Sequence, residues 1–230
     1  MLKVSGFFPG TLFYLIIMYE PISSLSHFLF IPIVLGVGYV FYKRSAGKPH
    51  WRVGTLVFVI SAVFLLAMSG TYHALHPGEW RDFFQRMDYS GIFALITGTF
   101  TAIHVVYFKG FWRWGMIGLV GGLSLVAMTI HMFFWEDIHF FVSAGIYLFL
   151  GWMGFFSFLK LRREVPFKNL RFGALGGIIY TLGTIFMFTE YPVIVPRWFG
   201  HHEIWHFFVI AGLTMHMLFL LKGMERELAN

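Results

Sequence analysis

The sequence has no cysteine and few charged residues. Among its 230 residues, 12% are charged, whereas 58% are hydrophobic and 21% are aromatic. The absence of cysteine excludes disulfides, thiolate nucleophiles and cysteine-ligated metal sites, so any metal must be bound by His, Asp or Glu. The scarcity of charge excludes an ordinary soluble domain and indicates an integral membrane protein.

Seven apolar stretches account for most of the chain. Each is about 18 to 22 residues long, which is the length that an α-helix needs to cross a bilayer. They lie near residues 22–42, 52–73, 87–107, 112–131, 138–159, 172–189 and 203–222. The predicted fold class is an all-α integral membrane protein, with one domain at 22–222 that forms a bundle of seven transmembrane helices.

Two short segments flank the predicted domain. Within residues 1–21, the apolar stretch Phe7–Tyr19 is too short to span a bilayer and is interrupted by Pro9 and Gly10. We therefore expect residues 1–21 to form an interfacial segment, and the lack of a small-residue cleavage site argues against a signal peptide. Residues 223–230 are expected to form a short C-terminal tail.

The net charge of +6 comes from basic residues in short clusters between the apolar stretches. This distribution is typical of membrane topology signals and not of nucleic-acid binding. Four of the 17 basic residues fall in the N-terminus and the even-numbered loops; the other thirteen fall in the odd-numbered loops and the tail. Because positive charge accumulates in the cytoplasm, the pattern predicts a multi-pass cell-membrane protein with an exterior N-terminus and a cytoplasmic C-terminus.

Polar residues within the spans gather at one membrane face. The end of the second helix, the start of the third and the start of the seventh all meet there, and they carry Ser69, His73, Asp88, His202 and His206. Ser69 and His73 are one turn apart, as are His202 and His206, so each pair can point at one cavity. Ionisable groups at membrane depth are functional candidates by default.

These residues have the composition of a catalytic zinc site. Three imidazoles plus a water-filled position form such a site, and we predict His73, His202 and His206 as the ligands of Zn²⁺. Asp88 is the candidate base that orients or deprotonates the water, and Ser69 can donate a hydrogen bond to the water or to an oxyanion. Whether Asp88 binds the metal directly or through water stays open, as does a structural zinc site that only ties the helices together.

The segment HHEIWH also spells HExxH, the zinc motif of metalloproteases, with Glu203 in the position of the base. Such enzymes need a further downstream ligand, but the nearest acid, Glu225, lies about 28 Å further along the helix. The only downstream histidine, His216, lies about 15 Å away by the same rise. The sequence therefore favours an upstream third ligand, His73, and a helix-start role for Glu203, where an acidic side chain suits the helix dipole.

Other histidines within the spans are interpreted as packing residues. An isolated His in a transmembrane helix is more often hydrogen-bonded to a neighbouring helix or placed at the interface than bound to a metal. We assign His104, His131 and His139 to this class, outside the predicted site.

The ordered set of motifs resembles the hemolysin III family, which belongs with the progestin and adipoQ receptors and more distantly with alkaline ceramidases. The motifs are EPISSLSH at 20–27, SxxxH at 69–73, DYSGIF from Asp88, TGTFT at 97–101, and HEIWH followed by His216. The resemblance covers nearly the whole chain. It implies a seven-helix bundle that binds one zinc ion through His73, His202 and His206, with Asp88 bound through water and Ser69 beside it.

The chain departs from the family pattern in three respects. It lacks the soluble N-terminal extension of animal receptor members, and SH at Ser26 and His27 replaces the usual TH. Receptor members also keep their N-terminus in the cytoplasm, opposite to the orientation that the charge count predicts.

Three function classes follow, each with a membrane lipid as its substrate or ligand and none with nucleic acid. The first is a zinc-dependent hydrolase of a lipid amide or ester, by analogy with the ceramidase-like members. The second is a lipid-sensing receptor or membrane-homeostasis regulator with a structural zinc site. The third is a pore-forming hemolysin, which ranks last because a pore needs polar residues along its whole length and here they gather at one end.

Overall fold

The computed structural model describes residues 18–196 and 198–229, so residues 1–17 of the predicted interfacial segment lie outside the described part. The helices are α2 (Pro21–Arg44), α3 (Pro49–Ala74), α4 (Glu79–Tyr107), α5 (Gly110–Phe133), α6 (Phe140–Trp152), α7 (Gly154–Leu161), α8 (Phe167–Thr189) and α9 (His201–Ala229). A 3-10 turn, η1 (Trp135–Asp137), precedes α6, and two short strands, β1 (Val193–Val195) and β2 (Phe199–Gly200), precede α9.

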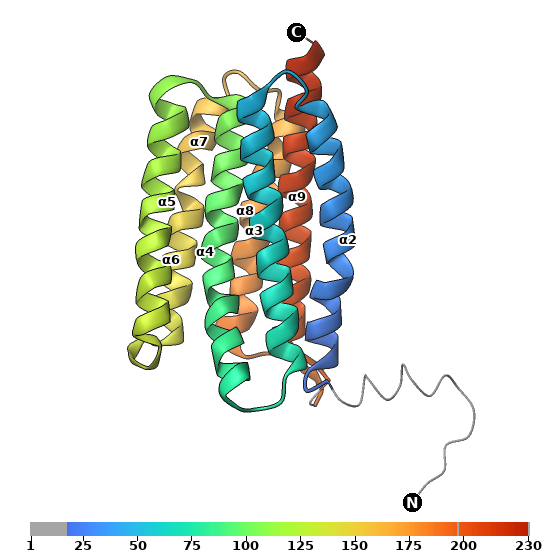
Figure 1. Cartoon of the computed structure of the whole chain (residues 1–230), viewed down its shortest axis with the longest axis vertical. Coiled ribbons are helices and arrows are strands. Elements are labelled where there is room, and N and C mark those ends of the chain that lie inside the picture. The colour runs from blue at the N-terminus through green and yellow to red at the C-terminus, as the bar shows by residue number, and fades with distance from the viewer. Residues whose placement is uncertain (1–17, 197, 230) are drawn as a thin grey trace, which may run out of the picture.

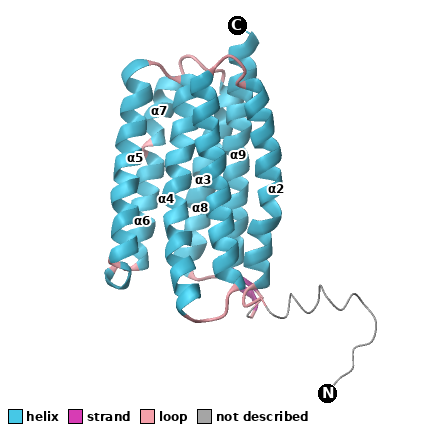
Figure 2. Cartoon of the chain, viewed as in Figure 1, coloured by secondary structure: helices cyan, strands magenta, loops and turns pink. Residues whose placement is uncertain are grey.

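The helices confirm the predicted fold class. In the described residues, seven helical spans are long and apolar enough to cross a membrane, and α6 and α7 together make one of them, Phe140–Leu161. Nearly all of the described chain is helical (Figure 2). A helix satisfies its backbone hydrogen bonds internally, which is why helices suit a chain with this much apolar surface in a bilayer.

The spans run side by side as a single up-and-down bundle (Figure 1). Spans that are consecutive in sequence pack together, and α2 also packs against α9. Helices α3 and α4 are the most buried, whereas α2, α5 and α8 present most of their apolar residues outward, as lipid-facing helices do. The core therefore lies between α3, α4 and α9 and includes Phe58, Leu66, Val105, Leu213 and Leu220.

Close packing of α3 on α4 depends on a small residue. A Cβ atom added at Gly91 of α4 would lie 2.9 Å from the Cα of Leu65 in α3, too near for any larger residue without a backbone shift. Small residues commonly allow such approaches between transmembrane helices. This contact fixes the distance between the two helices that carry Ser69, His73 and Asp88.

Threonine hydroxyls within the spans form hydrogen bonds with the backbone of their own helix. The hydroxyls of Thr55 and Thr99 donate to the carbonyl oxygens of Trp51 and Leu95, four residues earlier, at 2.8 Å and 2.7 Å. This local bond lets a polar side chain sit in an apolar helix without a partner from elsewhere. Such threonines need no functional explanation.

Several helix ends differ from the sequence prediction; α4, for example, begins at Glu79 and not near residue 87. Helix α9 continues through Ala229, so it includes residues that we assigned to the C-terminal tail. The fifth span is interrupted at Met153, which separates α6 from α7 and is flanked by Gly151 and Gly154. Glycine lowers helix stability, and a glycine-flanked position is a common place for a helix to break.

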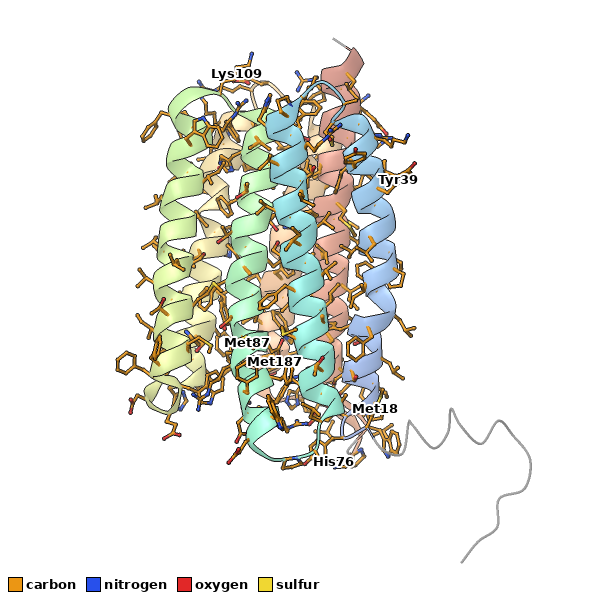
Figure 3. All side chains as sticks on the ribbon, viewed as in Figure 1. Met18, Tyr39, His76, Met87, Lys109 and Met187 are labelled. Atoms are coloured by element: carbon orange, nitrogen blue, oxygen red, sulfur yellow. The ribbon has the colours of Figure 1, made fainter. Side chains whose placement is uncertain are left out.

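The two ends of the bundle differ in charge. His76 and Met18 mark one end, and Lys109 marks the other, where the C-terminus also lies (Figure 3). The connections α2–α3, α4–α5 and α7–α8 lie at the Lys109 end, because successive helices run in opposite directions. The basic clusters predicted to face the cytoplasm therefore share that end with the C-terminus.

Candidate metal centre

Three histidines converge at the end of the bundle marked by His76. His73 lies one residue before the end of α3, and His202 and His206 occupy the first two turns of α9. One ring nitrogen from each lies within 4.8 Å of the other two, and His73 and His206 are almost completely buried. Among the described residues, this is the one cluster of three or more potential ligands that meets metal-site spacing.

One pair of these ring nitrogens has the spacing of two ligands of a tetrahedral metal. The Nε2 atoms of His73 and His202 are 3.2 Å apart. Two nitrogens bound to the same zinc ion at about 2.0–2.1 Å lie about 3.3–3.4 Å apart in tetrahedral geometry. This pair therefore needs little movement to bind one metal, and the ligand atoms of all three histidines lie within 4.8 Å of one another.

Neighbouring acceptors orient two of the rings. Nδ1 of His73 donates to Oε2 of Glu20 at 2.5 Å, and Nδ1 of His206 donates to the carbonyl oxygen of Ser23 at 3.1 Å. Both bonds place the ring hydrogen on Nδ1 and leave Nε2 as the ligand atom. A metal-binding histidine characteristically donates its other nitrogen to a carboxylate or carbonyl in this way.

Glu20 is itself held by a buried arginine. Arg81 of α4 donates to the same oxygen of Glu20 at 2.9 Å and also to the carbonyl oxygens of Tyr72 and Leu75. Its guanidinium lies 4.4 Å from the ring centres of both Tyr19 and Tyr72. Burial alone would raise the pKa of Glu20, but the hydrogen bonds and charges of His73 and Arg81 lower it to about 2. Glu20 therefore remains a carboxylate at neutral pH.

Ser69 and Asp88 lie beside the histidine cluster. Ser69 is buried on α3, one turn before His73, and Asp88 lies on the neighbouring helix α4. Both residues line a cavity of about 70 Å³ that His202 and His206 also line. This volume exceeds several-fold the roughly 15 Å³ that one water needs, so the cavity has room for water next to the carboxylate.

Glu203 has a different environment. Its Oε1 accepts a hydrogen bond from Ser23 Oγ at 2.7 Å, and its Oε2 accepts one from the backbone N–H of Gly200 at 2.8 Å. Gly200 immediately precedes α9, so Glu203 is the third residue of the helix and reaches back to the capping position. Both oxygens serve the helix start and its contact with α2, as the helix-start interpretation expected.

Sequence reasoning missed the residues that α2 brings to the site. It placed Glu20 at the end of an interfacial segment and gave Ser23 no role. Glu20 directly precedes Pro21, and Pro at the first helical position is a helix-start signal. That signal places Glu20 at the membrane face where α3 ends, and so within reach of His73.

His27 is a further buried histidine at this centre. Its ring stacks on that of His206, with centroids 3.9 Å apart and planes 11° from parallel. It lines the same small cavity, and neither of its nitrogens has a hydrogen-bond partner among the described residues. This stacking restricts the orientation of the His206 ring.

The histidines assigned to packing lie outside the cluster. Nε2 of His104 is 3.0 Å from Ser157 Oγ, and Nε2 of His131 is 2.7 Å from Ser143 Oγ. In both, Nδ1 donates to a carbonyl oxygen four residues earlier, so the serine hydroxyl donates to Nε2. These bonds connect α4 to α7 and α5 to α6. His139 stacks on Phe141 at the start of α6.

A second, larger cavity adjoins the metal centre. It has a volume of about 390 Å³ and lies among α4, α6, α7, α8 and α9, with mostly apolar walls. Leu65, Ile92, Tyr147, Thr184, Trp205 and Val209 line both cavities. The two cavities are therefore neighbours.

Comparison with known proteins gives a consistent result. A family model described as "Haemolysin-III related" matches residues 16–217. The chain is 29% identical to "Hemolysin-3 homolog" of Bacillus subtilis over 75% of its own length and 78% of that protein. It is 31% identical to "Heptahelical transmembrane protein 1" of Arabidopsis thaliana, over 76% of this chain and 57% of that protein. It is also 26% identical to "Adiponectin receptor protein" of Drosophila melanogaster, over 83% of this chain and 47% of that protein.

Proposed function

This chain belongs to the haemolysin-III related family of multi-pass membrane proteins, which includes adiponectin-receptor-like relatives, and from that premise we propose that it is a zinc-dependent hydrolase of a membrane lipid. The bond cleaved is an amide or ester. The observation that carries the proposal is the cluster of His73, His202 and His206 beside a cavity that also holds Asp88. A purely structural metal site does not need a carboxylate next to a water-sized space.

The donor set favours zinc. The chain offers imidazoles and no thiolates, and three imidazoles leave a fourth position open, as in catalytic zinc sites. Zinc bound there would polarise a carbonyl group and make a nearby water more acidic. Glu20 and the carbonyl of Ser23 hold the rings with their Nε2 atoms toward the cluster.

Side chains of the protein would carry out the proton transfer and stabilise the oxyanion. Asp88 accepts a proton from a water in the small cavity and can return it to the leaving group. Ser69, which lines the same small cavity as Asp88, would donate a hydrogen bond to a developing oxyanion. Glu203 takes no part in proton transfer, because both its oxygens are engaged at the helix start.

The large cavity supports a lipid substrate. Its walls are mostly apolar and it adjoins the small cavity, so an acyl chain can lie in it while a carbonyl group reaches the histidines. Trp152, Phe155 and Ile178 line this cavity and are also about half exposed on the outer surface of the bundle. These residues would face the acyl chains of the bilayer, from which the substrate would enter.

A lipid-sensing regulator with a structural metal is the second candidate. The Drosophila relative is named an adiponectin receptor, which favours this candidate. The same cavity and histidines would then bind a lipid without turning it over. A pore is the weakest candidate, because the buried ionisable residues of the metal centre gather at one end and the large cavity has mostly apolar walls.

The deciding experiment measures metal content and lipid hydrolysis on the same purified preparations. Wild-type protein is expected to contain about one zinc per chain and to hydrolyse at least one class among ceramides, acyl amides and phospholipids. His206→Ala should lose both properties, while His131→Gln, altered at a packing histidine, should keep both. Zinc without hydrolysis of any of these lipids would favour the regulator, and full zinc occupancy in His206→Ala would refute the site.

A further inference from the structure

Near the middle of helices α8 and α9, one aromatic ring from each helix packs against a glycine of the other. The ring of Tyr180 in α8 covers Gly212 in α9, where an added Cβ would lie 2.8 Å from the phenol carbons. In return, His216 in α9 covers Gly176 in α8, where an added Cβ would lie 2.6 Å from Nε2. The two rings stack on each other, with centroids 5.7 Å apart and planes 21° from parallel. Their positions are therefore fixed by the helix pair.

The polar atoms of this pair have no partner within the described chain. Tyr180 Oη and His216 Nδ1 are both buried and form no hydrogen bond with any described residue. His104, which lines the same cavity, uses both of its nitrogens. A buried polar atom without a partner is destabilising, and in the hydrocarbon region bulk water is not at hand to supply one. A ligand in the cavity would supply the hydrogen-bond partners that these two atoms lack.

The pair faces the larger cavity at a defined depth. Tyr180 and His216 both line the 390 Å³ cavity. At the helical rise, Gly212, which Tyr180 covers, lies about 9 Å beyond His206 along α9, and His216 lies about 15 Å beyond it. A molecule whose head lies at the metal centre and whose chain fills the cavity would pass this pair partway along its chain.

We propose that Tyr180 and His216 form a subsite for a hydroxyl group carried in the middle of a lipid chain. A phenol hydroxyl can donate, and a neutral imidazole offers one donor and one acceptor nitrogen. An aliphatic hydroxyl both donates and accepts, so one such group satisfies both residues, whereas a methylene group satisfies neither. The subsite rests on the proposed function for the presence of a lipid chain, and it narrows the substrate class to hydroxylated acyl chains.

The test compares binding of octadecanoic acid with its isomers that carry one hydroxyl at successive mid-chain carbons. Purified protein in nanodiscs is titrated with each acid, and bound lipid is measured by competition with a fluorescent fatty acid. The wild type should bind one mid-chain isomer at least about two- to tenfold more tightly than the plain acid, the ratio expected from one net hydrogen bond. Tyr180→Phe and His216→Leu should reduce that ratio to about one or below.

A matched control is available one helical turn away. Thr184 lines the same cavity, but its hydroxyl donates to the carbonyl oxygen of Tyr180, so Thr184→Val should leave the hydroxyl preference unchanged. Each variant is first compared with wild type by gel filtration and thermal unfolding. Tyr180→Phe removes only an unpaired oxygen, so its lipid-free stability should not fall.

The outcomes separate the subsite from the proposed function. Tight binding of both kinds of acid with no preference in the wild type would overturn the subsite and leave the hydrolase proposal standing. A preference that survives in both Tyr180→Phe and His216→Leu would also overturn it. If the wild type binds no fatty acid at all, the subsite is overturned, and the hydrolase proposal is decided separately by the hydrolysis assay.

Discussion

The carboxylate of Glu20 and the imidazole of His73 form a 2.5 Å hydrogen bond between residues that are 53 positions apart. Glu20 immediately precedes α2, and His73 lies near the end of α3. Arg81 of α4 holds the same carboxylate oxygen, so three helices cooperate to orient one candidate ligand. This network orients His73 without adding a ligand atom to the candidate metal centre.

Replacing Glu20 by Gln should weaken zinc binding by about ten- to hundredfold, because partners behind the ligands contribute that much to metal affinity. Gln keeps the size of the side chain but removes the negative charge that His73 and Arg81 share. Zinc affinity is measured by competition with a chromophoric chelator. Glu225→Gln is the control, since Glu225 pairs with Arg44 and Lys222 and not with the candidate ligands. Equal affinity of Glu20→Gln and wild type would contradict the orienting role.

Glu203 should matter for stability and not for metal binding. Glu203→Ala removes the acceptor of two hydrogen bonds, from Ser23 and Gly200, and should lower the free energy of unfolding by about 0.5–2 kcal/mol, the usual cost of losing a helix cap. Glu203→Gln should be milder, because glutamine also serves at this capping position. Thermal unfolding and zinc content are measured together. Loss of zinc from Glu203→Gln at wild-type stability would show that the residue acts on the metal.

The sequence predicts features that depend on spacing along one helix better than features that depend on contacts between helices. Alternating helix direction and one-turn spacing were enough to bring His73, His202 and His206 to one face. Glu20 and Ser23 were not found, since their contacts with His73 and Glu203 depend on how α2 packs against α3 and α9, which no local pattern encodes. The break at Met153 was also missed, because its flanking glycines, Gly151 and Gly154, are tolerated in many transmembrane helices.

The orientation in the membrane is predicted from charge. A reporter fused after Asn230 should be cytoplasmic, because the basic clusters lie at the end of the bundle where the C-terminus lies. Lys109 marks that end in Figure 3. A second reporter inserted after His76, in the α3–α4 connection, should report the exterior. The reverse result at both positions would give the receptor-type orientation, with the metal centre on the cytoplasmic side.

The role of Asp88 separates an enzyme from a regulator. Asp88→Asn should abolish lipid hydrolysis, with rates reduced by at least about a hundredfold, while much of the zinc stays bound. Asparagine keeps the size of the side chain and can still hydrogen-bond to a water in the small cavity, but it cannot accept a proton. Hydrolysis of ceramides, acyl amides and phospholipids is assayed in detergent and in bilayers, with zinc measured in parallel. Glu203→Gln is the matched acid-to-amide control and should keep most of its activity. If Glu203→Gln is inactive while Asp88→Asn is active, the HExxH glutamate is the base, and its bonds to Ser23 and Gly200 must break during turnover.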